Sequence, residues 1–502
     1  FTAEAIDSHG THVAGTIACN ESTPAVVSGA DIPYDPSGVA PGAQLGSYTV
    51  FPGNVENARS EDILNAMQQA ALDGMDVINM SLGGNAHGIQ DLNTVAVDNM
   101  DRAGIVMAIS AGNEGPGYYT AGSPGSAERA LTAGASSVGH FVGAPILTGE
   151  KLVTVAMISD EFPLPGIDVK GDLAVLITSG TLSEACAPLT DGSLTGKIAL
   201  LSRGNCSFGQ KVFNAEQAGA EAVIVVNSRP GDPIGMAADA AFPTTIGAVM
   251  VGLADKATMM DLADEPVTIG ADNAYKRTGN DNILMDFSSF GPTDVSNRVK
   301  PDVVAPGGNV LSAVTHYACE DSKPHGCWAF YSGTSMASPH LAGMAAVVKQ
   351  ANPTWAAWQI RSAIVNTAQV DGVIKTDLSG IETDVLKVGS GLANLEAAVT
   401  AKLVFSSPSI SFGAVPSGSG KALTKTVTVT NVTNETVTTA VTIESATVPG
   451  AFKTTTTTIT LAKDAIATIP VSYYIAKGSA PGPVQAHLIV GTEHVALFAL
   501  AK

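Results

Sequence analysis

The chain has 502 residues, more than one hydrophobic core usually supports, so we expect two to four domains. Hydrophobic residues make up 45% of the chain and its mean hydropathy is +0.22, which excludes a disordered protein. The net charge of −20 repels phosphate backbones and argues against nucleic acid as a partner.

The segment from residue 1 to 138 alternates apolar strands with helices. Ser60–Gly74 carries apolar residues at helical spacing, and Asp76–Leu82 and Gly104–Ser110 have the apolar runs of buried strands. This alternation predicts a three-layer α/β fold, in which a parallel sheet carries helices on both faces.

The pattern changes between residues 139 and 280. Short strands are predicted at Lys197–Leu201 and Ala222–Val226, on either side of a helix at Gln210–Ala218. These elements indicate a small, separate α/β or β-rich module. The first pattern resumes from 281 to 401, so the sequence predicts one domain that is interrupted by another.

Residues 402–502 show a third sequence pattern. Thr424–Thr430 and Thr454–Leu461 show the alternation of half-buried strands, and Thr and Val suit a pleated surface. Several such strands at short spacing predict a β-sandwich of about 100 residues.

The strongest chemical signal is SGTSMASPHLAG at Ser332–Gly343. A helix predicted over Ser335–Gln350 begins at Ser335, so its hydroxyl would lie beside backbone N–H groups that can stabilise an oxyanion. The run is not the G-x-S-x-G nucleophile elbow, because Ala337 stands where that motif has glycine. A simple helix N-cap is the alternative.

Two histidines lie three residues apart in DSHGTHVAG, at Asp7–Gly15. A metal would need further ligands, and no HExxH motif or nearby Cys/His set supplies them, so no metal site is predicted. We expect His9 to act as the general base for Ser335, and His12, one turn later, to be structural.

Asn113 lies in SAGNEG, directly after the second predicted strand. An asparagine amide at the end of a strand can donate a hydrogen bond to a developing oxyanion. The alternative is a turn residue that tolerates left-handed backbone.

Together these segments resemble the subtilase (subtilisin-like) family. HGTHVAG resembles its histidine motif, AGNEG its oxyanion motif and GTSMASPH its serine motif, which map to His9, Asn113 and Ser335. KPDVVAPG at Lys300–Gly307 matches a further family signature. The resemblance covers the two α/β segments and implies a subtilisin-like fold. It also implies a serine endopeptidase that cuts proteins by a Ser–His–Asp mechanism.

The resemblance also implies how substrate binds. Two short segments would pair with an extended peptide, and a glycine would form the floor of the pocket for the P1 side chain. The predicted substrate-binding residues are Ser81, Leu82, Gly83, Ser110, Ala111, Gly112 and Gly122. Because glycine leaves room and adds no charge, we expect large apolar P1 residues to be accepted.

The inserted segment resembles a protease-associated (PA) domain, in GKIALLSRGNCSF at Gly196–Phe208 and in AEQAGAEAVIVVN at Ala215–Asn227. In such domains Cys206 often pairs with an upstream cysteine, which here is Cys186. The C-terminal segment resembles the fibronectin-III-like sandwich of large subtilases. Both modules are expected to gate or dock protein substrates, with a spacer as the alternative for the sandwich.

Cys319 and Cys327 form a second local pair, and Cys19 is left over. Such pairs suit an oxidising, extracellular setting, whereas free buried thiols throughout are the alternative. No apolar run approaches the ~18 residues that span a bilayer. We therefore expect a monomer that is secreted or attached to the cell surface, with protein or peptide substrates.

The triad aspartate of the family is not in this sequence. Only eight residues precede His9, no D-[ST]-G motif occurs, and Asp7 belongs to the histidine motif. We expect the natural upstream strand with the aspartate to be absent here, which leaves this fragment weakly active or inactive. The alternatives are a binding or adhesive protein on an inactive scaffold, or another serine hydrolase such as an esterase.

The predicted chemistry requires no cofactor. Calcium is common in the family, but no D-x-[DN]-x-[DN]-G loop assigns a site to it.

Overall fold

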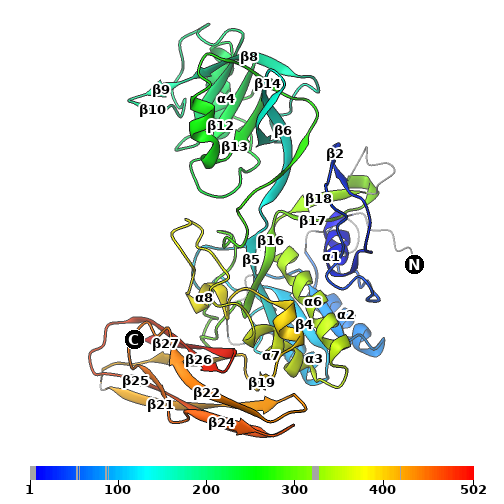
Figure 1. Cartoon of the computed structure of the whole chain (residues 1–502), viewed down its shortest axis with the longest axis vertical. Coiled ribbons are helices and arrows are strands. Elements are labelled where there is room, and N and C mark those ends of the chain that lie inside the picture. The colour runs from blue at the N-terminus through cyan, green and yellow to red at the C-terminus, as the bar shows by residue number, and fades with distance from the viewer. Residues whose placement is uncertain are drawn as a thin grey trace.

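The computed structural model describes residues 7–51, 55, 57–84, 88, 90–318, 327–418 and 420–502. They form three lobes along the long axis of the molecule (Figure 1). An inserted domain lies at the top, an α/β domain in the middle and an all-β domain at the bottom.

The middle lobe is built on four parallel strands in the order β16–β5–β4–β3. All five residues of β4 are buried, because alternate side chains point to opposite faces and both faces are covered. Helices α6 and α7 pack on one face, and α2 and α3 on the other (Figure 1). The predicted α/β fold is thus confirmed. The elements are β3 (Val77–Met80), β4 (Val106–Ser110), β5 (Leu131–Ser137), β16 (Val303–Gly308), α2 (Ser60–Leu72), α3 (Leu92–Arg102), α6 (Thr334–Ala351) and α7 (Ala357–Asn366).

Smaller elements complete this lobe. Helix α1 packs against α6 and against β17, which brings the helix of His9 to the helix of Ser335. Asp7 begins α1 as its N-cap, and its Oδ1 accepts a hydrogen bond from the His9 N–H at 2.6 Å. The elements are α1 (Ser8–Ala18), β1 (Val26–Val27), β2 (Ala30–Asp31), β17 (Val310–Ala313), η2 (His316–Ala318), β18 (Trp328–Tyr331), α8 (Val385–Val388) and α9 (Leu395–Val399).

The inserted domain lies between β5 and β16 in the sequence. Its eight-stranded sheet closes on itself, because β14 pairs with both β8 and β6. Four parallel strands form its centre, and α4 packs on one face of them. The elements are β6 (His140–Thr148), β7 (Lys151–Met157), β8 (Val169–Val175), β9 (Ile177–Thr178), β10 (Thr181–Leu182), β11 (Lys197–Ser202), α4 (Phe208–Gln217), β12 (Ala222–Val226), β13 (Gly247–Val251), η1 (Leu253–Asp255), α5 (Lys256–Met260), β14 (Pro266–Ile269) and β15 (Ala274–Arg277).

The C-terminal lobe consists of two sheets, of four and five strands, that share one apolar core and therefore form a β-sandwich. The strands are β19 (Leu403–Phe405), β20 (Ser409–Val415), β21 (Lys421–Asn431), β22 (Val437–Glu444), β23 (Phe452–Thr454), β24 (Thr458–Leu461), β25 (Ile466–Ile475), β26 (Gly482–Val490) and β27 (Glu493–Ala501).

The prediction of one continuous strand over Thr454–Leu461 is wrong. The chain leaves one sheet after Thr454 and joins the other at Thr458, since β23 pairs with β25 and β24 pairs with β22. The Thr454 hydroxyl accepts a hydrogen bond from the Thr456 N–H at 3.2 Å. Such a local side-chain bond competes with the strand ladder and favours a turn.

Cys186 and Cys206 of the inserted domain form a disulfide with an S–S distance of 2.07 Å. Cys319, half of the second predicted pair, lies outside the described residues. Cys19 is a free, half-buried thiol, and desolvation raises its pKa.

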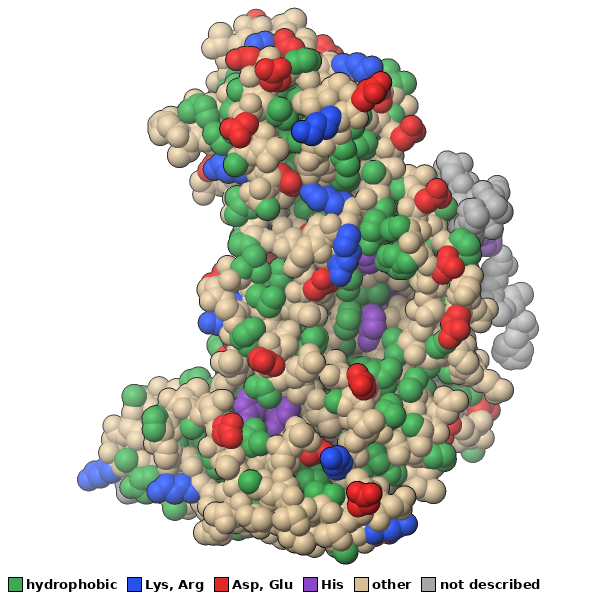
Figure 2. All heavy atoms as spheres, in the orientation of Figure 1, with side chains coloured by type: hydrophobic (Ala, Val, Ile, Leu, Met, Phe, Trp, Pro, Cys, Tyr) green, Lys and Arg blue, Asp and Glu red, His purple; other side chains and the backbone are tan. Residues whose placement is uncertain are grey.

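The face of the molecule in Figure 2 carries acidic side chains on all three lobes, with Lys and Arg between them. In the described part of the chain, every helix is too short or too polar to span a bilayer. No membrane helix is therefore found among these residues.

One buried histidine of the sandwich predicts sensitivity to acid. His487 is 4% exposed, neither ring nitrogen has a hydrogen-bond partner among the described residues, and the His494 ring lies 5.4 Å away. Desolvation, with a smaller contribution from His494, lowers the pKa of His487 to about 4. The unfolded chain takes up this proton near pH 6.5, so stability is full above that pH. It falls by about 3 kcal/mol as the pH drops to 4.

The measurement is the free energy of unfolding at pH 7 and at pH 4, for the wild type and for His487→Phe. The His487→Phe protein should lose less stability between the two pH values. A change of the exposed His316 to Gln is the matched surface control. Equal losses in wild type and His487→Phe would contradict the prediction.

Candidate active site

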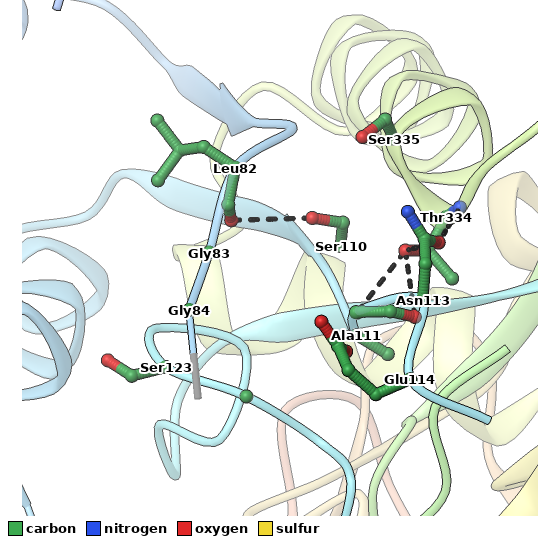
Figure 3. A pocket seen from close by; sticks show the side chains of 12 residues that line it. Leu82, Gly83, Gly84, Ser110, Ala111, Asn113, Glu114, Ser123, Thr334 and Ser335 are labelled. Carbon is green, nitrogen blue, oxygen red and sulfur yellow. Dashed lines mark hydrogen bonds between the residues drawn. The ribbon is translucent and has the colours of Figure 1, made fainter. Parts of the chain in front are cut away.

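A cavity of about 210 Å³ lies where the segments after β3 and β4 meet the start of α6. All of the predicted substrate-binding residues except Ser81 line it, together with Asn113 and Ser335. The lining residues are Leu82, Gly83, Gly84, Ser110, Ala111, Gly112, Asn113, Glu114, Gly122, Ser123, Thr334 and Ser335. Figure 3 shows Ser335 and Asn113 on one side of this space and Leu82 to Gly84 on the other.

Ser335 is the second residue of α6, which begins after Gly333. The first N–H groups of a helix have no partner within it, so donors are available around the Ser335 hydroxyl. The hydroxyl itself is half-buried and points toward the Ser81 carbonyl oxygen, 3.5 Å away, which is too long for a strong hydrogen bond. The Ser335 hydroxyl proton is thus held by a weak hydrogen bond only.

Asn113 is held in one orientation by Thr334. Asn113 Oδ1 accepts hydrogen bonds from the Thr334 N–H and from the Thr334 hydroxyl, both at 2.9 Å. The amide Nδ2 of Asn113 is therefore not used by Thr334 and remains available as a donor. A Cβ added to Gly333 would lie 3.6 Å from Asn113 Nδ2 and 3.6 Å from the Ser335 nitrogen. Two donors therefore flank one space beside the Ser335 side chain, which is the arrangement that stabilises an oxyanion.

His9 lies in the first turn of α1 and is not among the residues that line the cavity. Within the described residues, no side chain forms a hydrogen bond with its ring. The His9 side chain keeps contact with solvent, yet partial desolvation lowers its pKa, and the Asp7 carboxylate opposes part of that effect. The ring is therefore neutral at pH 7 and able to accept a proton.

His12 occupies a different environment. It is fully buried, its Nε2 lies 2.9 Å from the Val310 carbonyl and 3.2 Å from the Ala329 carbonyl, and its ring stacks on Tyr331 at 4.5 Å. Desolvation lowers the pKa of His12 to about 4. These contacts tie α1 to β17 and β18, which is a structural role.

The floor of the cavity is fixed by two backbone hydrogen bonds. The Gly84 N–H donates to the Ser123 carbonyl at 2.9 Å, and the Ser123 N–H donates to the Gly84 carbonyl at 3.0 Å. A Cβ on Gly122 would lie 2.7 Å from the Gly84 oxygen, so only glycine permits this approach. The two segments therefore meet at the bottom of the cavity.

Four of the lining residues were not among the predicted site residues: Gly84, Glu114, Ser123 and Thr334. Glu114 and Thr334 stand next to Asn113 and Ser335 in their motifs, so their neighbours could have indicated them. The Glu114 carboxylate accepts a hydrogen bond from the Ser289 hydroxyl at 3.0 Å. Gly84 and Ser123 directly follow the predicted residues Gly83 and Gly122, in segments that the family resemblance had already indicated, and their mutual contact brings both to the cavity.

Metal ligands are not gathered at this site. Among the described residues, the one close group of three Cys, His, Asp or Glu side chains consists of Glu184, Cys186 and Cys206 of the inserted domain. Its two sulfur atoms are bonded to each other. The group is thus no metal site in this form of the protein.

Most of the chain is similar to proteins of one family. Residues 2–391 match the model of the Subtilase family. The chain is 33% identical over 420 residues to the Minor extracellular protease Vpr of Bacillus subtilis (strain 168), covering 82% of this chain and 47% of that protein. It is 31% identical over 441 residues to the PI-type proteinase of Lactococcus lactis subsp. cremoris, covering 79% and 22%.

A plant relative is the Subtilisin-like protease SBT1.4 of Arabidopsis thaliana, 30% identical over 385 residues, with 72% of this chain and 47% of that protein covered. The chain thus spans about half, or less, of the length of these relatives. Because the family model matches well over half of the chain, this protein belongs to the subtilase family.

Proposed function

We propose that this chain is the greater part of a secreted serine endopeptidase that hydrolyses peptide bonds of proteins. The observation that carries the proposal is the pair of donors, Asn113 Nδ2 and the Ser335 N–H, around one space beside the Ser335 hydroxyl. A hydroxyl next to two fixed donors suits attack on a carbonyl, since the donors stabilise the negative charge that develops on its oxygen.

In the proposed reaction the residues act in the following order. Ser335 Oγ attacks the peptide carbonyl carbon, and His9 accepts the hydroxyl proton. The carbonyl oxygen becomes an oxyanion that accepts hydrogen bonds from Asn113 Nδ2 and the Ser335 N–H. His9 then gives the proton to the leaving amine, and water repeats the sequence on the acyl-enzyme. The chemistry requires no cofactor, and calcium remains an expectation without an assigned site.

We infer that the triad aspartate reaches His9 from sequence upstream of these residues. The His9 ring has no hydrogen-bond partner among the described residues, and Asp7 is engaged as the N-cap of α1. The parallel sheet ends at β3, whose outer edge pairs with no described strand. A further strand could pair there, and β3 leads directly into Ser81 and Leu82.

Substrate would bind as an extended strand between Leu82–Gly83 and Ser110–Gly112. Gly122 at the floor leaves room for a large apolar P1 side chain. The carboxylate of Glu114 adds negative charge to the lining, so we extend the expected P1 range to long side chains with a basic end.

The accessory domains support a protease of large substrates. We propose that the inserted domain, whose motifs resemble a PA domain, and the fibronectin-III-like sandwich gate or dock proteins, and that the molecule is a monomer. The disulfide Cys186–Cys206 and the extracellular relative from Bacillus subtilis favour secretion.

The test is fluorophosphonate labelling of the protein as it is secreted, followed by peptide mapping. Label is expected on Ser335 and should be absent from Ser335→Ala. An intact, folded product without label would favour a binding or adhesive protein on an inactive scaffold. Label with turnover of esters but not of peptides would favour an esterase.

A further inference from the structure

Helix α6 contains a proline four residues after Ser335. In an α-helix the N–H of residue 339 would donate to the carbonyl of residue 335. Pro339 has no N–H, so the Ser335 carbonyl loses its donor within the helix. A polar backbone group in this half-buried place needs another partner.

Ser81 supplies that partner. Its hydroxyl donates to the Ser335 carbonyl oxygen at 2.6 Å, across 254 residues of sequence. Ser81 is the predicted substrate residue that does not line the cavity. Its side chain acts on the nucleophile's backbone instead.

The Ser81 hydroxyl is itself oriented. Asn79 Nδ2 donates to Ser81 Oγ at 3.1 Å, and the Asn79 Oδ1 accepts from the Ser338 hydroxyl at 2.7 Å. Ser338 is fully buried on α6. Because the amide of Asn79 occupies a lone pair of Ser81 Oγ, the one hydroxyl proton of Ser81 is left for the Ser335 carbonyl. The network thus begins and ends on α6.

We propose that Asn79 and Ser81 are positioning residues, which clamp the backbone of Ser335 so that its N–H and hydroxyl stay aligned with Asn113. This inference rests on the proposed function. The clamp ties the first turn of α6 to β3 at the point where Pro339 weakens the helix. Small displacements of a reacting group lower rates strongly, so the alignment matters.

The experiment is a double-mutant cycle of Ser81→Ala and Pro339→Ala on the protein as it is secreted. Pro339→Ala restores the N–H that can bond to the Ser335 carbonyl, so it makes the Ser81 hydroxyl redundant. We expect Ser81→Ala to lower the rate of fluorophosphonate modification of Ser335 about tenfold, and by less than about twofold when Pro339→Ala is present. Ser81→Thr, which keeps a hydroxyl, should retain most of the rate.

The urea midpoint of unfolding provides a second readout that does not depend on reactivity. Ser81→Ala should lower it in the wild type and hardly at all in the Pro339→Ala background. Additive effects in both readouts would overturn the clamp. If the wild type took no label, the proposed function would fail. The urea midpoints would still test the clamp, because effects of Ser81→Ala and Pro339→Ala that depend on each other support it and additive effects contradict it.

Discussion

Joining an upstream strand that ends in an aspartate to this chain is expected to raise its turnover of a peptide substrate about 3 × 10⁴-fold. That factor is the one known for loss of the aspartate in subtilisin, and we carry it over to this member of the family. The physical reason is that no described residue acts as a hydrogen-bond partner that would fix the tautomer of His9 and stabilise the imidazolium formed during attack. The measurement is kcat on a chromogenic peptide amide.

The matched control carries asparagine in place of that aspartate. It should fold and pair with β3 in the same way, but its turnover should stay near that of the chain alone. Equal kcat values for the aspartate and asparagine forms would show that the carboxylate plays no part.

Replacing Asn113 with aspartate in the active enzyme should lower kcat by about 10²–10³-fold with little change in KM. This range is known for removal of an oxyanion donor in subtilisin and is applied here to a relative. The carboxylate keeps an acceptor for Thr334, but it places an oxygen where the proposed mechanism has the Asn113 Nδ2 donate to the oxyanion. The loss therefore appears in the transition state and not in substrate binding.

Thr334→Val provides the comparison. It removes the hydroxyl that bonds to Asn113 Oδ1 but leaves both the Thr334 N–H bond and the Nδ2 donor in place. We expect it to lower kcat by less than about tenfold. An Asn113→Asp enzyme with kcat within threefold of the wild type would exclude an oxyanion role for this residue.

The parts of the site that sequence could predict are those with a local cause. Ser335 stands in the first turn of α6, and Asn113 follows shortly after the end of β4, both beside small residues that flank an apolar element. The strands predicted at Asp76–Leu82 and Gly104–Ser110 contain β3 and β4, because a continuous apolar run is typical of a strand buried on both faces.

The parts that sequence could not predict depend on contacts between distant segments. Ser81 and Ser335 are 254 residues apart, so nothing in the motif around Ser81 shows that its hydroxyl reaches a carbonyl that Pro339 leaves without a donor. The closure of the inserted sheet has the same cause, because β14 and β6 pair only in the folded chain. At Thr454 a local side-chain hydrogen bond favours a turn, although the alternation of residues in the sequence predicts a continuous strand.

The two connections between the inserted domain and the α/β domain have a consequence for how this architecture can change. The chain enters the insert at His140 and leaves it at Arg277, and these residues are direct partners in neighbouring strands β6 and β15. Partners of this kind lie about 5 Å apart, a gap that a tight turn can close. The two ends of the inserted domain therefore lie side by side. The chain could be closed without the insert by a short turn. Loss of the insert would still expose apolar surface on the α/β domain, because Val142 and Tyr275 pack in one cluster with Ala25, Val27 and Trp328.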